Sequence, residues 1–225
     1  MPIYSKMGFL FLTVIVILGS GMPMEASGAE LSAVAVAERL QKEYEQTITF
    51  VADFKQTTRM EMARRPREAE GTVLFKKPGR VRWDYRLPDR QVIVSDGEVL
   101  RMYFEQAQQM IRTSAKAAMQ SDVTYAFFAG TGSLTANFDA VAAEAGIEAS
   151  SGQYVIKLLP KEPHPQVDRL YVWVDGNNFI MVRLRIVDLF GSVTDLFFEN
   201  IERNVTLADD LFAFEPPPGT EIIEQ

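Results

Sequence analysis

The residue types that most often carry catalysis are scarce in this sequence. It contains one histidine, His164, and no cysteine. Without cysteine the chain has no thiolate nucleophile, no disulfide framework and no cysteine–histidine zinc site. A Ser-His-Asp triad would have to use His164, which stands between Pro163 and Pro165 in a segment typical of a turn. We therefore expect His164 to have a structural rather than a catalytic role.

Two short motifs resemble parts of known catalytic loops, but both are incomplete. Ser95-Asp96-Gly97 lacks the flanking glycines of a nucleophile elbow. Gly130-Thr131-Gly132 is too short for a phosphate-binding loop. The carboxylates are scattered without metal-ligand spacing. The sequence predicts no catalytic residue, no metal and no cofactor, and it makes a hydrolase the weakest hypothesis.

The composition fits a globular domain with a substantial core. Hydrophobic residues make up 47% of the chain, which is enough to bury a core in one domain of ordinary size. The formal net charge is -7, and there is no dense run of lysine and arginine. Such a chain is a poor candidate for binding nucleic acid, because phosphate contacts need clustered positive charge.

The N-terminal residues are typical of an export signal. Lys6 supplies a positive charge, Gly8–Leu18 is almost wholly apolar, and Ser27-Gly28-Ala29 offers small residues before a cleavage site. We expect a signal peptide at 1–29 and one mature domain at 30–225, soluble and outside the cytoplasm. The alternative is an uncleaved membrane anchor. No cysteine follows the apolar run, so we do not expect the chain itself to be lipidated.

The periodicity of the mature chain predicts one helix followed by many strands. Apolar residues recur at helical spacing over Leu31–Gln46, and the period changes to two from Thr47. Turn residues separate the strands that follow, and a helical insert is expected between two strand groups. The expected strands after the first are 71–77, 80–86, 91–95, 99–105, 154–159, 169–174, 179–188 and 193–204; the insert is 113–135, residues 138–150 fit helix or strand, and a short turn covers 208–212. This order predicts one α+β domain.

Alternation along two neighbouring strands separates an apolar face from a charged one. Val81, Trp83 and Tyr85 share a face, whereas Arg82 and Asp84 point the other way. The same parity aligns the side chains of two other strands, and these are Val73, Phe75 and Lys77 on the first and Leu100, Met102 and Phe104 on the second.

Two hypotheses explain this apolar face. It can be the buried side of an ordinary sheet, covered by a conventional core. Alternatively, because roughly nine strands have little helical material to cover them, a curled sheet would keep an apolar cavity for an apolar ligand. Ten methionines fit such a cavity, since methionine adapts to irregular shapes, but they fit a plain core as well.

A series of short motifs resembles the periplasmic outer-membrane lipoprotein carrier family, of the LolA type. Each motif is weak alone, but their order and spacing are specific over nearly all of the mature chain. They are the N-terminal helix, Ala52-Asp53-Phe54-Lys55-Gln56, Gly71 through Lys76-Lys77-Pro78, Trp83-Asp84-Tyr85 followed by Pro88, Ile93-Val94-Ser95-Asp96-Gly97, Tyr103-Phe104, and Phe212-Ala213-Phe214-Glu215-Pro216-Pro217-Pro218-Gly219.

The resemblance implies an incomplete, half-open antiparallel β-barrel with a helical lid on its concave face. It implies a monomeric periplasmic chaperone that takes lipoprotein acyl chains from an inner-membrane releasing transporter to an outer-membrane receptor. The receptor shares the fold but is itself a lipoprotein, so the lack of cysteine favours the carrier. The alternative is an envelope lipid-sensing, regulatory module of the same fold. The expected acyl-binding residues are Val73, Phe75, Val81, Trp83, Tyr85, Met102, Phe104, Phe127 and Phe128.

Lys77 departs from the pattern of this family. The position resembles the gate residue, commonly an arginine, that holds the lid closed. Lysine offers a point charge where arginine offers a planar fork, so the latch is expected to be weaker or differently arranged. We expect Lys77 to bind the carbonyl groups near residues 127–130, where a short helix ends. The alternative is that Lys77 is a solvated lysine in a turn.

Overall fold

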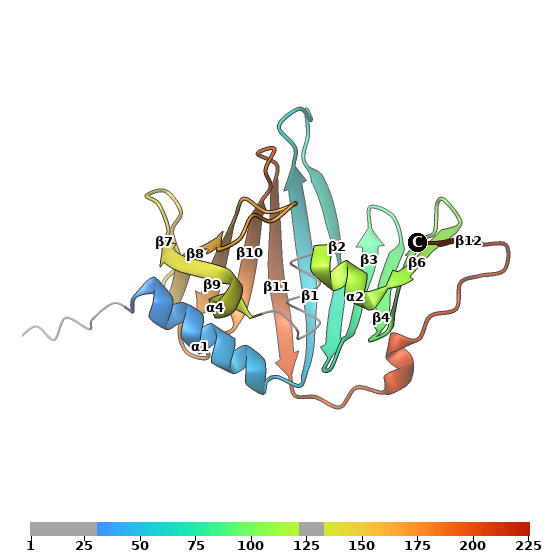
Figure 1. The fold of residues 1–225 in the computed structure, drawn as a ribbon, viewed down its shortest axis with the longest axis horizontal. Coiled ribbons are helices and arrows are strands. Elements are labelled where there is room, and N and C mark those ends of the chain that lie inside the picture. Colours follow the sequence, from blue (N-terminus) through green and yellow to red (C-terminus); the bar gives the residue numbers. More distant parts are fainter. Residues whose placement is uncertain (1–30, 122–132) are drawn as a thin grey trace, which may run out of the picture. The chain divides into compact units, whose positions relative to one another are not determined.

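Strands dominate the computed structural model, which describes residues 31–121 and 133–225. The strands form one sheet in the order β12-β6-β5-β4-β3-β2-β1-β11-β10-β9-β8-β7 (Figure 1). The helices and the short 3-10 helix η1 are α1 (Ala33–Gln46), α2 (Ala115–Ser121), α4 (Leu134–Asn137) and η1 (Asp209–Phe212). The strands are β1 (Thr49–Arg59), β2 (Arg67–Lys76), β3 (Arg80–Leu87), β4 (Gln91–Asp96), β5 (Val99–Phe104), β6 (Gln109–Ser114), β7 (Phe138–Ala142), β8 (Gln153–Pro160), β9 (Arg169–Asp175), β10 (Met181–Val187), β11 (Val193–Arg203) and β12 (Glu221–Glu224).

The sheet consists of two meanders joined by one long-range pair. Strands β1 to β6 pair consecutively, as do β7 to β11, and β1 pairs with β11 to connect the two groups. All of these pairs are antiparallel, and β12 adds a parallel pair at the edge of β6. In the described residues β12 and β7 are the free edges, so the sheet is open. The α+β class and the open barrel are confirmed, with one parallel edge strand that was not predicted.

Helix α1 begins at a side-chain cap and ends where the chain enters β1. The Ser32 hydroxyl oxygen accepts a hydrogen bond of 3.2 Å from the Ala35 amide, which satisfies one free N–H of the first turn. Val36, Leu40 and Tyr44 are buried at helical spacing. The helix packs against β7, β8 and α4. This apolar stripe fixes which side of α1 meets the sheet.

The face of the sheet that carries α1 and α2 is called here the helix face. Its core contains the aromatic side chains of Phe50, Phe54 and Phe75 together with aliphatic residues from most strands. The ring of Phe54 lies over Gly71 of β2: a Cβ atom at residue 71 would come within 2.8 Å of that ring and 2.0 Å of the Asp84 carbonyl oxygen. Only glycine fits at this position, and it lets Phe54 lie close to the sheet.

The opposite side of the sheet, called here the outer face, carries two smaller clusters. One contains Val92, Val94, Tyr103 and Met110, and it is covered by Phe212 of η1. The other contains Tyr171, Trp173 and Val187, packed against apolar residues of the segment 143–149. These coverings bury alternate residues of strands whose other residues face the helices, so both sides of the sheet are partly apolar.

Several element predictions need correction. The strand β6 occupies Gln109–Ser114, so the expected helical insert cannot begin at Thr113, and α2 starts at Ala115. Residues 138–142 of the ambiguous segment form β7, because they pair with β8. The strand β2 begins at Arg67 rather than Gly71, since β1 pairs along its whole length. The strand β12 was not predicted, and the centre of the expected insert lies outside the described residues.

Candidate apolar binding site

A cavity of about 260 Å³ lies against the helix face. Strands from both meanders line it, and Ala118 of α2 closes part of it. Its side chains are mainly apolar, as a site for an apolar ligand requires. The lining residues are Gln56, Trp83, Tyr85, Ile93, Leu100, Met102, Ala118, Ile186, Thr194 and Leu196.

One wall of the cavity is built on aromatic rings that pack edge to face. The ring centroid of Phe54 lies 4.8 Å from that of Trp83 and 4.9 Å from that of Tyr85. Trp83 also lies 6.4 Å from Phe198 of β11. These arrangements are the favoured geometries of aromatic pairs. They fix the wall of the cavity through ring packing.

One end of the cavity is polar. The Tyr85 hydroxyl donates to Gln56 Oε1 at 3.2 Å, and Gln56 Nε2 donates to Thr58 Oγ1 at 3.3 Å. Thr58 Oγ1 and Thr194 Oγ1 are 3.2 Å apart and share a hydrogen bond. This row of polar groups, called here the polar rim, crosses from β3 to β11. It lies at the end of the cavity nearest the β1–β2 and β10–β11 turns. Thr58 is one residue from the end of β1, and its partner Thr194 is one residue from the start of β11.

The residues predicted from the sequence fall into four groups. Trp83, Tyr85 and Met102 line the cavity. Val73, Phe75 and Val81 lie on the same face but are fully buried in the core. Phe104 is half-buried at the end of β5 and is not among the lining residues. Phe127 and Phe128 lie outside the described residues.

The sequence prediction did not name the lining residues of β4, α2, β10 and β11, nor Leu100 of β5 and Gln56 of β1. Nothing local to the sequence joins Ile186 and Thr194 to Trp83. That information lies in the pairing of β1 with β11, which brings residues 136 positions apart into contact. Gln56 lies within one of the recognised motifs, yet its side-chain role was not predicted.

Lys77 contacts the C-terminal end of α1. Its ammonium group donates a hydrogen bond to the Tyr44 carbonyl oxygen and lies 4.0 Å from the centroid of the Tyr44 ring. Burial lowers the pKa of Lys77, and the nearby Glu45 carboxylate opposes this effect in part. A cation is favourable here because the C-terminal end of a helix carries partial negative charge, although the Tyr44 carbonyl oxygen also accepts the Thr47 amide at 3.1 Å. Lys77 is therefore not a solvated lysine in a turn, because it has an acceptor in α1. The acceptors expected at 127–130 lie outside the described residues.

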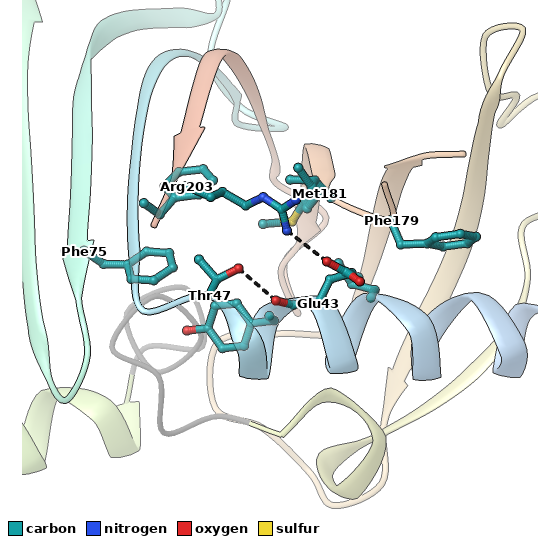
Figure 2. Close-up of a pocket in the computed structure, with 10 residues that line it drawn as sticks. Glu43, Thr47, Phe75, Phe179, Met181 and Arg203 are labelled. Atoms are coloured by element: carbon teal, nitrogen blue, oxygen red, sulfur yellow. Dashed lines mark hydrogen bonds and ion pairs between the residues drawn. The ribbon is translucent and has the colours of Figure 1, made fainter. Parts of the chain in front are cut away.

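A second, much smaller pocket lies beside the same helix end (Figure 2). Its volume is about 30 Å³, and Phe75, Phe179 and Met181 supply much of its wall. Figure 2 shows Arg203 of β11 reaching Glu43 of α1, at 3.0 Å. Together with Lys77, this ion pair fastens the end of α1 to both meanders.

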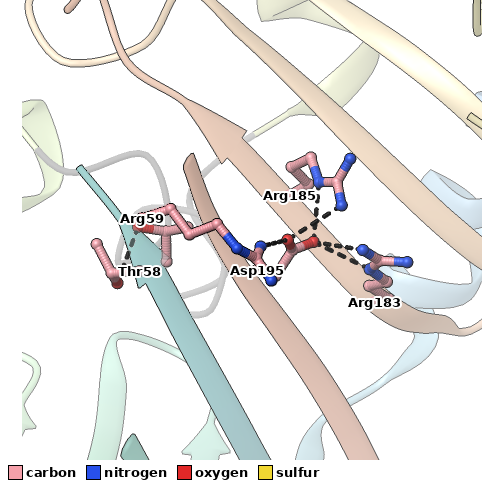
Figure 3. A network of polar contacts seen from close by, with 6 residues as sticks. Thr58, Arg59, Arg183, Arg185 and Asp195 are labelled. Carbon is pink, nitrogen blue, oxygen red and sulfur yellow. Dashed lines mark hydrogen bonds and ion pairs between the residues drawn. The ribbon is translucent and has the colours of Figure 1, made fainter. Parts of the chain in front are cut away.

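A buried carboxylate on the outer face binds several arginine side chains (Figure 3). The Asp195 side chain is almost inaccessible and accepts hydrogen bonds from Arg183, at 2.7 and 3.0 Å, and from Arg185, at 2.9 and 3.1 Å. Arg59 approaches it at 3.4 Å. Burial raises the pKa of Asp195, but the hydrogen bonds and charges of Arg185 and Arg183 outweigh burial, so its pKa lies below the ordinary value.

His164 lies in the segment between β8 and β9. Its Nδ1 atom accepts a hydrogen bond of 3.2 Å from the Gln166 amide, which stabilises the turn between β8 and β9. Within residues 31–121 and 133–225, no three acidic or histidine side chains gather in a way that could hold a metal ion.

None of the helices in the described ranges is both long enough and apolar enough to span a bilayer.

The sequence matches the model of the family described as outer membrane lipoprotein carrier protein LolA over residues 45–215. The chain belongs to the LolA family. The match includes β1 to β11 and η1, and hence all described lining residues of the cavity. The family membership predicted from the ordered motifs is confirmed.

Similar proteins cover nearly the whole chain. The outer-membrane lipoprotein carrier protein of Methylococcus capsulatus is 30% identical over 96% of this chain and 98% of its own length. The protein of the same description from Alkalilimnicola ehrlichii is 30% identical over 97% of this chain and 95% of its own. A solved structure, an uncharacterized conserved protein from Thermus thermophilus, aligns with a TM-score of 0.55 at 12% identity, covering 86% of this chain and 99% of that one. At 12% identity, the likeness between this LolA family member and the Thermus thermophilus protein concerns the fold alone.

Proposed function

We propose that this protein is a periplasmic chaperone that carries the acyl chains of lipoproteins in the cavity on its helix face. The observation that carries the proposal is the cavity itself, whose described walls are mainly apolar and whose polar side chains gather at one end. Membership of a family of lipoprotein carriers supports the same ligand class. The function requires no catalytic residue, metal or cofactor.

The polar rim gives the ligand a direction. An acyl chain gains about 0.8 kcal/mol for each methylene group that leaves water, so the apolar part of the cavity favours the chain. The ester and amide groups where acyl chains join a lipoprotein need hydrogen-bonding partners. Gln56, Thr58 and Thr194 offer these partners, so the linkage would lie at the rim and the chain would extend toward Leu100 and Met102.

The cavity must widen to receive a complete acyl chain. At about 260 Å³ it is smaller than typical pockets for small molecules, which span roughly 300–1,000 Å³. The wall most easily moved is α2, which contributes Ala118 and belongs to neither meander. We infer that α2, together with α1 on the same face of the sheet, forms the lid. Closure of the lid then competes with the cargo, and this competition permits release.

Lys77 would act as a latch in this cycle by holding the end of α1. Its contact with the Tyr44 carbonyl joins β2 to α1, and Tyr44 in turn packs against Phe75 at a centroid distance of 5.7 Å. A ligand that separated α1 from β2 would have to break this contact. The described acceptor of this latch lies in α1, and the acceptors expected from the sequence at 127–130 lie outside the described residues.

The partners follow from the proposed cargo. The chain would be exported by residues 1–29 and act as a monomer. It would receive lipoproteins from an inner-membrane releasing transporter and deliver them to an outer-membrane receptor. The regulatory alternative, an envelope lipid sensor, has no observation in its favour.

Uptake of a fluorescent fatty acid and of a triacylated lipopeptide tests the cavity. Trp83→Glu should abolish the uptake of both, because it places a charge in the aromatic wall. Trp83→Phe keeps an aromatic ring there and should retain uptake. If Trp83→Glu remained folded by circular dichroism and bound both probes like the parent, the acyl site would lie elsewhere.

Transfer of a loaded lipopeptide to acceptor vesicles tests the latch. Lys77→Leu removes the donor to Tyr44 and should load normally but release more slowly, since less closure energy opposes the cargo. Lys77→Arg keeps a donor and should release at or above the parental rate. Lys76→Leu is the control, because Lys76 binds Asp209 and the Leu207 carbonyl on the outer face. Equal release by Lys77→Leu and the parent would exclude a latch.

A further inference from the structure

Two neighbouring turns display large apolar side chains to solvent. The β1–β2 turn, residues 60–66, exposes 99% of Met62. The β10–β11 turn, residues 188–192, exposes 80% of Phe190 and 56% of Leu189. We name the two turns together the turn surface. Exposed apolar residues of this size commonly mark a contact surface when they are grouped.

The two turns are adjacent in space although they are far apart in sequence. Arg59 at the end of β1 pairs with Val193 at the start of β11. A Cβ atom at Gly191 would lie 3.5 Å from Glu61 Oε2, so the turns approach each other beyond the last strand residues. Figure 1 shows both at the same end of the sheet, away from α1.

Hydrogen bonds fix the turn that carries Phe190. The Asp188 carboxylate accepts from the amides of Phe190 and Ser192, both at 2.8 Å. The Asp188 amide also donates to the Ser192 carbonyl oxygen at 3.0 Å. The backbone that carries the exposed ring is therefore held in place, and little backbone freedom remains to be lost when the ring enters another medium.

Positive charge predominates beside the β1–β2 turn. Arg64, Arg65 and Arg67 are exposed in or beside this turn, and Arg59 lies at its base with a largely exposed side chain, against the two carboxylates of Glu61 and Glu68. The chain as a whole is acidic, with a formal net charge of -7. A local basic group on an acidic protein orients it toward a negatively charged surface.

We propose that the turn surface docks on anionic lipid membranes. Met62, Leu189 and Phe190 would enter the interfacial region, and the arginines would bind lipid phosphates. A group of apolar tips with arginines beside one of the two turns fits a bilayer better than a protein groove, because no described concavity joins the tips. The polar rim, with Thr58 and Thr194, lies one strand residue behind these turns. Docking would thus place the polar end of the cavity next to the membrane.

Vesicle flotation tests the proposal directly. The probes are phosphatidylcholine vesicles with and without phosphatidylglycerol, mixed with protein recovered after export from its host. The parent should float with the anionic vesicles, and salt should weaken this binding. Phe190→Ser with Met62→Ser should weaken partitioning by about ten-fold or more, since two apolar side chains no longer leave water. Arg64→Glu with Arg65→Glu should remove the preference for phosphatidylglycerol.

Matched controls separate the turn surface from general effects. Ile48→Ser changes an apolar side chain of 54% exposure at the opposite end of β1. Lys42→Glu reverses an exposed charge on α1. Both controls should float like the parent, and the turn variants should keep the parental melting temperature and lipopeptide uptake in solution. Those two readouts make failure of this proposal distinguishable from failure of the carrier proposal.

Three results would overturn the proposal. The first is a parent that does not float with anionic vesicles. The second is equal flotation by the parent and by the variants of Phe190, Met62, Arg64 and Arg65. The third is binding only to vesicles that contain membrane proteins, which would make the turn surface a protein-docking site.

Discussion

The helix face and the outer face of the sheet both contain apolar clusters, but different contacts hold them. On the helix face, Phe54, Trp83 and Tyr85 meet through ring contacts, and polar groups stay at the rim of a cavity. On the outer face, Asp195 is bonded to Arg183 and Arg185, and Trp173 donates to the Glu148 carbonyl oxygen at 2.9 Å.

The arginines of the outer face also contact aromatic rings. The guanidinium group of Arg183 lies 4.0 Å from the ring centroid of Trp173 and 4.5 Å from that of Phe197. A charged group between two rings, bonded to a buried carboxylate, has one favourable geometry. The outer face is thus specified by directional contacts, whereas the helix face is specified by shape.

This difference suits the proposed division of roles. Contacts between apolar groups are non-directional, so an acyl chain can replace a neighbouring side chain on the helix face without leaving a polar group unsatisfied. Replacing a contact of Asp195 would leave a buried charge unpaired. We infer that the helix face can open and close while the outer face holds β10 and β11 in register and, through Arg59, also β1 of the other meander.

The largest expected effect comes from removing the centre of the outer face. Asp195→Ala leaves three arginines without their shared carboxylate and should lower the free energy of unfolding by about 3 kcal/mol. Glu199→Ala, which removes an exposed ion pair with Lys55, should cost far less, because solvent screens exposed pairs. Urea unfolding measures both. A loss for Asp195→Ala as small as that for Glu199→Ala would show that the outer face does not depend on this network.

A matched pair of methionines sharpens the comparison. Met110 is buried beneath Phe212 on the outer face, whereas Met102 lines the cavity on the helix face. Met110→Ala should cost about 3 kcal/mol of stability and leave lipopeptide uptake unchanged. Met102→Ala should cost about 1 kcal/mol, because its site is already incompletely filled, and it should change the chain length that binds best. The same stability loss at both sites would contradict the assignment of an unfilled cavity to the helix face.

Local patterns of the sequence predicted the composition of the helix face well. Period-two alternation separated Trp83 and Tyr85 from Arg82 and Asp84, and the structure has Arg82 bonded to Asp84 on the outer face at 2.6 and 3.1 Å. Alternation depends only on the strand itself, so it survives without knowledge of the partners. The motif order was also sufficient to predict the family.

Contacts between distant segments could not be predicted in the same way. The edge strand β12 follows a proline-rich segment and is only four residues long, so its pairing with β6 is a tertiary effect. Ile186 and Thr194 reach the cavity through the β1–β11 pair. The acceptor of Lys77 lies in α1, whose end is positioned by Glu43 and Arg203. Each case depends on the three-dimensional arrangement rather than on spacing.

The smallest expected effect is the pH dependence of stability that Glu144 contributes on the outer face. Glu144 receives a hydrogen bond from Lys157, and this bond is the main reason that its pKa is lowered to about 2; the Tyr171 hydroxyl donates a further bond of 2.9 Å. A carboxyl group whose folded pKa is lowered stabilises the protein above its unfolded pKa. That stabilisation is lost as the pH falls from about 4.5 toward 2.

Solvent limits the size of this effect, because half of the Glu144 side chain is exposed. Glu144→Gln should therefore lower stability at neutral pH by less than about 1 kcal/mol and flatten the decline between pH 4.5 and 2. Glu162→Gln, in an exposed turn, should leave the decline unchanged. Lipopeptide uptake per folded molecule should be the same in both variants, since Glu144 lies on the side of β9 that carries Tyr171 rather than the cavity. A change in uptake that followed the protonation of Glu144 would mean that the two faces are coupled, and the division of roles between them would fail.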